Sequence, residues 1–215
     1  MSAAPVALAL PGWFGKLPGM GDFAHRRLPD AFRETWDHWL HDGLMRLRER
    51  HADWSTRYLE APLWCFVLGR GVVGDRCWLG VLMPSVDGVG RYFPFTVAIA
   101  FDVGDVPPDI LRWWALAAQA ALDGLAHDLD ALRFEALLQQ LFGEGAAASD
   151  GGVVDGESAA RERGDLLPPP GLAQWLTAPE DATAPRMATA GLPRGAAFDA
   201  LFGFGNAPLP PEMQT

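Results

Sequence analysis

The sequence predicts an α/β fold in which at least part of the central sheet is antiparallel. Three apolar runs of strand length, at 63–68, 77–83 and 92–101, follow one another with only short turns between them. Short connections of this kind join antiparallel neighbours, whereas parallel neighbours need a long crossover. The runs carry very few polar side chains, so we expect these strands to be buried on both faces or nearly so.

A strand and a long helix precede these runs. The apolar run at 13–17 is closed by Pro18 and Gly19, which predicts a short strand that ends in a turn. The clearest helix begins at Pro29, because proline at the first helical position has no amide to leave unpaired, and it is expected to end near His51. Its apolar stripe consists of Phe32, Trp36, Trp39, Leu40, Gly43, Leu44 and Leu47.

Two further helices follow the third strand. Pro107, Pro108 and Asp109 form a helix start signal, and apolar residues then recur at helical spacing over 110–125 and over 130–142. The first stripe consists of Ile110, Leu111, Trp114, Ala117, Ala118, Ala121, Leu122 and Leu125, and the second of Leu132, Leu137, Leu138 and Leu141.

The length of 215 residues suits one domain with a substantial core. We expect a single domain over 1–215, with an ordered core at about 11–142 and 171–205. The segment 143–170 has few large apolar residues and cannot offset its own ordering entropy, so a mobile loop is predicted there. The proline-rich tail, 206–215, is expected to fray.

Charge and hydropathy exclude several classes of function. There are 17 Lys and Arg residues against 27 Asp and Glu residues, for a net charge of -10, so no nucleic acid partner is expected. The start of the chain has no basic region typical of a signal peptide, and no apolar run is long enough for a membrane span. These observations together predict a cytoplasmic protein.

The cysteine and histidine content indicates no metal site and no cofactor. Cys65 and Cys77 lie in apolar runs, and two cysteines make neither a disulfide framework nor a zinc site with four ligands. We expect buried free thiols. His38 and His41 are three residues apart on the long helix, without the four-residue spacing typical of helical metal ligands.

The glycines at 69, 71 and 74 match a dinucleotide-binding pattern by letters, but a strand follows them instead of a helix. This segment is therefore interpreted as a hairpin turn. Ser85 and Asp87 suggest an alternative function, that of a small hydrolase or a ligand-binding domain. The glycines of a nucleophile elbow are missing around Ser85, and a serine turn explains the segment equally well.

Two segments, 12–23 and 80–94, each combine a strand end, a Gly/Pro turn, charges and aromatic residues. If both turns lie at one sheet edge, the charged side chains of the two segments meet. Two interpretations remain open: an internal ion-pair and turn network that fixes the sheet, or a partner-binding surface with aromatic and arginine anchors. The candidate partner-binding residues are Trp13, Lys16, Asp22, Ser85, Asp87 and Arg91, of which Lys16 is the only lysine in the chain.

Four motifs carry a resemblance to a known family. They are Gly-Lys-Leu-Pro-x-x-Gly-Asp-Phe at 15–23, Trp-Asp-x-Trp-Leu at 36–40, Ala-Pro-Leu-Trp-x-Phe at 61–66 and the block from Gly to Pro at 80–94. In this order and spacing they resemble the TagF family of proteins associated with the type VI secretion system. The resemblance covers about 12–125.

The resemblance implies a three-layer α/β/α sandwich with a mixed, largely antiparallel central sheet. It implies a protein that is not an enzyme and that acts as a post-translational repressor of type VI secretion in Gram-negative bacteria. The implied partner is the cytoplasmic scaffold protein with a forkhead-associated domain, which such repressors bind and sequester. On the hypothesis that Lys16 and Arg91 contact this partner, Lys16→Ala and Arg91→Ala should weaken binding with little change in melting temperature.

Overall fold

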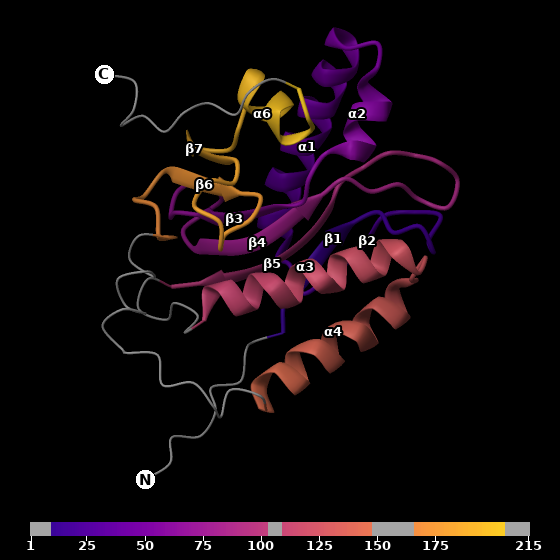
Figure 1. Ribbon diagram of the computed structural model, residues 1–215, viewed down its shortest axis with the longest axis vertical. Helices are drawn as coiled ribbons and strands as arrows, with labels where there is room; N and C mark the ends of the chain where they lie inside the picture. Colours follow the sequence, from indigo (N-terminus) through magenta and orange to yellow (C-terminus); the bar gives the residue numbers. More distant parts are fainter. Residues whose placement is uncertain (1–9, 103–108, 148–165, 205–215) are drawn as a thin grey trace.

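A computed structural model describes residues 10–102, 109–147 and 166–204, and gives no side-chain detail for 144–147 (Figure 1). Most of the predicted loop at 143–170 and the whole predicted tail at 206–215 lie outside the described residues. The strands are β1 (Gly12–Gly15), β2 (Ala24–Arg26), β3 (Trp64–Leu68), β4 (Cys77–Met83), β5 (Phe95–Phe101), β6 (Leu172–Leu176) and β7 (Arg186–Ala190). The helices are α1 (Asp30–Arg50), α2 (Trp54–Glu60), α3 (Ile110–Ala126), α4 (Ala131–Ala147) and α6 (Ala196–Leu201).

The seven strands form one sheet in the order β2-β1-β5-β4-β3-β6-β7. The combination of this sheet with helices confirms the α/β class. Every pairing among these strands is antiparallel, so the expectation of a mixed sheet is wrong. The reason lies in the connections. The long helical connections run from β2 to β3 and from β5 to β6, and neither joins neighbouring strands, so no parallel pair arises.

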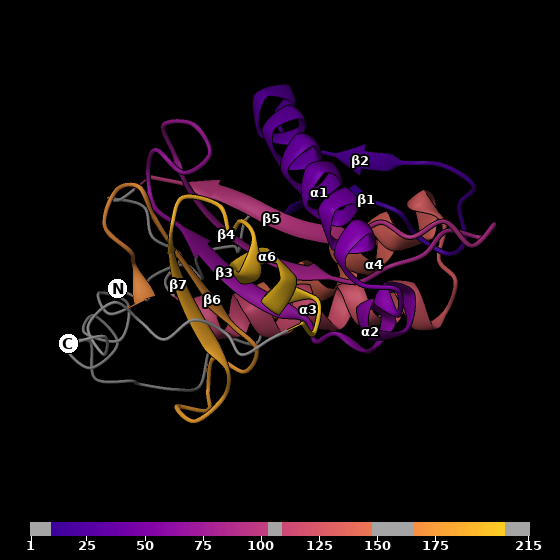
Figure 2. The same ribbon diagram turned by 90° about the horizontal axis from the view of Figure 1, so that it is seen from above.

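Alternation along the strands gives the sheet two apolar faces. In Figure 1, α1, α2 and α6 lie above the strands and α3 and α4 lie below them; Figure 2 looks down on the first group. One core contains Trp36, Trp64, Phe66, Trp78 and Trp175 among others, and the second contains Trp13, Val67, Val81, Phe95 and Val97. The prediction that these strands are buried on both faces is confirmed, apart from two half-buried residues near the end of β5, Ile99 and Ala100.

The predicted stripe of α1 is buried except at Gly43, which is half-buried. A β-carbon on Gly43 would lie 2.2 Å from the Phe198 ring, so glycine at this position lets α6 pack closely against α1. The helix begins at Asp30, one residue later than predicted, with Pro29 as its N-cap, and it ends at Arg50, next to the predicted end at His51.

The stripes of α3 and α4 are only partly as predicted. Leu122 and Leu132 are exposed, whereas Trp113 and Phe134, which the pattern did not include, are buried. The two helices approach closely at Gly124, where a β-carbon would lie 2.9 Å from the Phe134 ring. Trp113 and Phe134 both belong to the core on this side of the sheet, so tertiary packing and not spacing alone selects the buried positions.

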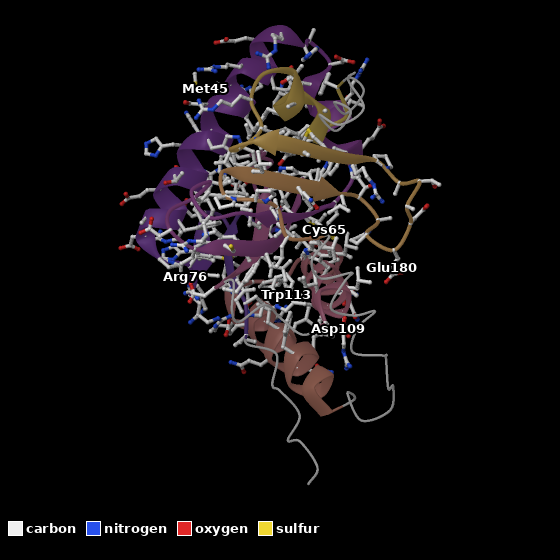
Figure 3. The ribbon with its side chains drawn as sticks, turned by 90° about the vertical axis from the view of Figure 1, so that its left-hand side faces the viewer. Met45, Cys65, Arg76, Asp109, Trp113 and Glu180 are labelled. Atoms are coloured by element: carbon white, nitrogen blue, oxygen red, sulfur yellow. The ribbon has the colours of Figure 1, made fainter. Side chains whose placement is uncertain are left out.

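The segment after 170 docks on the main core, as expected. β6 pairs with β3, and the Trp175 ring lies 5.2 Å from that of Phe66 between centroids. Figure 3 shows Cys65 and Trp113 inside the molecule and Met45 on α1 near the surface. Both cysteines are free and buried, and burial raises the pKa of the Cys65 thiol to about 12.

Candidate functional site

The two segments singled out in the sequence meet where β1 and β4 end. The Gly88 amide donates to the Met20 carbonyl oxygen at 3.1 Å, which joins the two turns through their backbones. The Ser85 hydroxyl donates to the Lys16 carbonyl oxygen at 2.7 Å. A β-carbon on Gly88 would lie 2.8 Å from the Pro18 carbonyl oxygen, so glycine allows this close approach.

Asp87 is the centre of the junction, and its side chain is fully buried. Its Oδ2 atom lies 2.8 Å from Lys16 Nζ and 2.7 Å from Arg91 Nε. Its Oδ1 atom accepts hydrogen bonds from the backbone amides of Val89, at 3.1 Å, and Arg91, at 2.9 Å. The carboxylate therefore fixes the turn from both of its oxygens.

These contacts determine the charge of Asp87. Burial alone would raise the pKa of its carboxyl group, because a low dielectric disfavours the charged form. The hydrogen bonds from Lys16, Arg91 and Val89 outweigh burial and hold the pKa well below its usual value. Asp87 is therefore ionised at neutral pH and paired with two cations.

Tyr58 closes the network on the α2 side. Its hydroxyl donates to the Ser85 carbonyl oxygen at 3.1 Å and accepts from the Ser85 amide at 3.0 Å. Burial raises the pKa of Tyr58 far above its ordinary value, so the phenol stays neutral. Ser85 is buried and its hydroxyl is bonded to a carbonyl oxygen rather than to a base, which gives the hydrolase alternative no support from geometry.

The six candidate residues separate into a buried group and an exposed group. Trp13, Lys16, Ser85 and Asp87 are buried, and Trp13 Nε1 donates to Glu135 Oε2 at 3.2 Å on the α4 side. Asp22 is exposed and accepts a bond from the Phe23 amide, without an ion pair among the residues that the structure describes. The internal network that the sequence suggested is present, with Lys16, Ser85, Asp87 and Arg91 in it.

The network supports an exposed surface, which we call the lip and define as residues 20–23 and 88–91. Val89 is 69% exposed, the Arg91 side chain 54% and Phe23 44%. The Arg91 guanidinium also donates to the Gly21 carbonyl oxygen, across the two loops. The sequence-based candidates did not include Val89 and Phe23. For Val89 the signal was an apolar residue between the two glycines of a turn, where no strand or helix can bury it.

Phe23 is held in place although it is exposed. Its ring lies 4.7 Å from the Phe93 ring, edge to face, and 6.0 Å from the stacked Phe14 ring. Lys16 Nζ lies 5.0 Å from the centroid of Phe23, a cation–π contact. The lip thus presents a fixed aromatic ring, an aliphatic side chain and a guanidinium together.

The comparisons with known proteins decide the family. Residues 12–141 match the model of the TagF N-terminal domain, described as type VI secretion system-associated. The chain belongs to the TagF N-terminal domain family. The match includes both lip segments and the resemblance found in the sequence is confirmed.

A solved structure extends the likeness of this TagF-family chain beyond the matched segment. The crystal structure of PA0076 from Pseudomonas aeruginosa PAO1 is 28% identical, with a TM-score of 0.70 over 93% of this chain and 97% of that one. A comparison with curated protein sequences gives no match.

Two searches of the described residues bear on ligands and membranes. Within residues 10–102, 109–147 and 166–204, no helix combines the length and the apolar character that crossing a membrane requires. The same part of the chain contains no group of three His, Cys, Asp or Glu side chains that could hold a metal ion.

Proposed function

We propose that this TagF-family protein is a non-catalytic, post-translational repressor of type VI secretion. It acts in the cytoplasm by binding and sequestering a scaffold protein with a forkhead-associated domain. Membership of a family associated with type VI secretion supports the pathway. The proposal requires no cofactor and no nucleic acid, in line with the net charge of -10.

The observation that carries the proposal is the lip. Arginine and aromatic side chains are enriched at the energetic centres of protein interfaces, and a rigid surface loses less entropy on binding. Phe23, Val89 and Arg91 are exposed together. Asp87 holds the backbone amides of Val89 and Arg91, and the Phe23 ring is held by its contacts with other phenylalanine rings. We assign the partner contact to Phe23, Val89, Arg91 and Asp22, with Trp13, Lys16, Ser85 and Asp87 supporting them from the interior.

The proposed repressor is one domain over 1–215. Two separate cores, one on each side of the sheet, support a three-layer α/β/α arrangement for it. In this arrangement the lip lies where strands β1 and β4 end.

A secretion assay tests the function. Deleting the gene from its bacterium should raise type VI secretion into the medium, and the wild-type gene on a plasmid should reverse the increase. Val89→Asp should fail to reverse it, because it places a charge on the apolar part of the lip while leaving the buried network intact.

Arg91→Ala and Arg76→Ala form a matched pair for the same assay. The two arginine side chains are equally exposed, at 54% and 52%, and each has one carboxylate partner. Arg76 lies just before β4, and Arg91 lies in the lip segment that follows β4, so the two positions lie at opposite ends of that strand. Arg76→Ala should restore repression and Arg91→Ala should not; secretion that is unchanged by the deletion would overturn the repressor role.

A further inference from the structure

A second candidate site lies away from the lip, between α1 and the segment that leads into α6. It is a cavity of about 230 Å³. Trp39 and Phe198, both buried, form its apolar part together with Leu192 and Pro193. Figure 2 shows α6 beside α1 on this side of the sheet.

Three contacts keep the walls of the cavity in place. The Trp39 indole Nε1 donates to the Pro193 carbonyl oxygen at 2.7 Å, which joins α1 to the segment before α6. The Trp39 and Phe198 rings meet edge to face, with centroids 5.6 Å apart. Arg50 Nε donates to Asp199 Oδ2 at 3.1 Å and joins the end of α1 to α6. The cavity is therefore preformed.

The charge of this cavity is opposite to that of the chain. Its lining includes Arg46, Arg50, Arg194 and one acidic residue, Asp42, so its formal charge is 3 − 1 = +2. Asp199 neutralises Arg50 and leaves +1, against -10 for the whole chain. Arg46 and Arg194 are exposed and have no ion-pair partner among the residues that the structure describes.

We propose that this cavity binds an acidic segment of a partner protein. One apolar or aromatic side chain of the segment enters the cavity and packs against Trp39 and Phe198, and a neighbouring carboxylate contacts Arg46 and Arg194. Pockets for drug-sized molecules have roughly 300–1,000 Å³. The smaller volume here suits one side chain, and the unpaired arginines suit a carboxylate beside it. The site shares no residue with the lip and does not depend on the proposed function.

Three short peptides test the chemistry of this site on the full chain. Acetyl-Phe-Asp-Asp-amide carries both the ring and the charges, acetyl-Phe-Asn-Asn-amide only the ring, and acetyl-Ala-Asp-Asp-amide only the charges. Binding is followed by NMR through the indole N–H signal of Trp39, which Trp39→Phe identifies. Titration of this signal should show that the first peptide binds with at least fivefold higher affinity than either of the others. Its affinity should fall as salt is added.

Variants locate the binding. Arg46→Gln and Arg194→Gln should each weaken binding of the first peptide by about fivefold. Arg48→Gln is the matched control, because Arg48 lies on the same helix but outside the cavity, over the Trp54 ring. Unchanged affinity in both Arg46→Gln and Arg194→Gln, or no shift of the Trp39 signal, would overturn the site. If free 3-phenylpropionate binds with the same affinity as the first peptide, the proposal that the cavity binds a peptide segment would be overturned.

Discussion

Replacing Lys16 with alanine tests whether this residue stabilises the fold from the interior or only contacts a partner at the surface. Lys16 is buried, and its ammonium group neutralises Asp87, whose side chain has no exposure at all. Without Lys16, the Asp87 carboxylate keeps Arg91 and two backbone amides as partners. The ordinary expectation for a surface residue, an unchanged melting temperature, therefore does not apply to Lys16.

The magnitude follows from the burial of the pair. Removing one partner of a buried ion pair costs about 3–5 kcal/mol of unfolding free energy. Because Arg91 remains, we expect the lower end, about 3 kcal/mol. In a domain of this size each kcal/mol lowers Tm by about 2–4 °C, so Lys16→Ala should lower Tm by about 6–12 °C. Arg91→Ala removes a half-exposed partner and should cost at most about 1 kcal/mol.

Differential scanning calorimetry of the two variants at neutral pH checks this ordering. Lys16→Ala should melt well below the wild type, and Arg91→Ala within about 4 °C of it. A Lys16→Ala protein with the melting temperature of the wild type would refute the reasoning, since it would mean that Asp87 needs no buried cation.

Three further predictions concern the same interior. Because the pKa of Asp87 is lowered in the folded protein, its charged form stabilises the fold at pH values above the ordinary pKa of 3.8, and this stabilisation is lost as the pH falls below 3.8. Urea unfolding at several pH values should therefore show that the unfolding free energy falls less on acidification in Asp87→Asn than in the wild type. An equal fall in both proteins would contradict the pairing of Asp87 with its cations. Tyr58→Phe leaves the buried Ser85 amide without its acceptor, although the Ser85 carbonyl oxygen keeps the Phe93 amide as a donor. It should lower the unfolding free energy by about 1–3 kcal/mol in the same assay, and an unchanged value would contradict a hydrogen bond from the Ser85 amide to Tyr58. The native protein should resist a thiol reagent at neutral pH, because burial raises the pKa of both Cys65 and Cys77, and two thiols should react after denaturation; rapid labelling of the folded chain would refute their burial.

The local elements with strong patterns were predictable from the sequence. The α1 stripe, the run that becomes β4 and the turn at 69–75 follow from spacing and composition, because one residue pattern fits one structure in each case. The short strand β2 and helix α2 were missed, since elements of three and seven residues leave little periodicity to detect. The order of strands was beyond the sequence because it depends on contacts between distant segments.

The candidate site was predictable in its location but not in its exposed residues. The pairing of Lys16 with Asp87 and of Asp87 with Arg91 follows from two charged turns at one sheet edge. Burial divided the charged candidates. Lys16 and Asp87 face inward, whereas Asp22 and Arg91 stay exposed beside the apolar Val89 and Phe23. The buried Asp87 carboxylate fixes the turn at 87–91 and leaves Val89 exposed at its tip.

Isothermal titration calorimetry of the purified chain with the scaffold protein tests the central claim most directly. The wild type and Arg76→Ala should bind with the same affinity, and Arg91→Ala and Val89→Asp should each bind at least tenfold more weakly while keeping melting temperatures near that of the wild type. Equal affinity in all four proteins, or no heat of binding with the wild type, would contradict the account of a regulator that holds its partner through the lip.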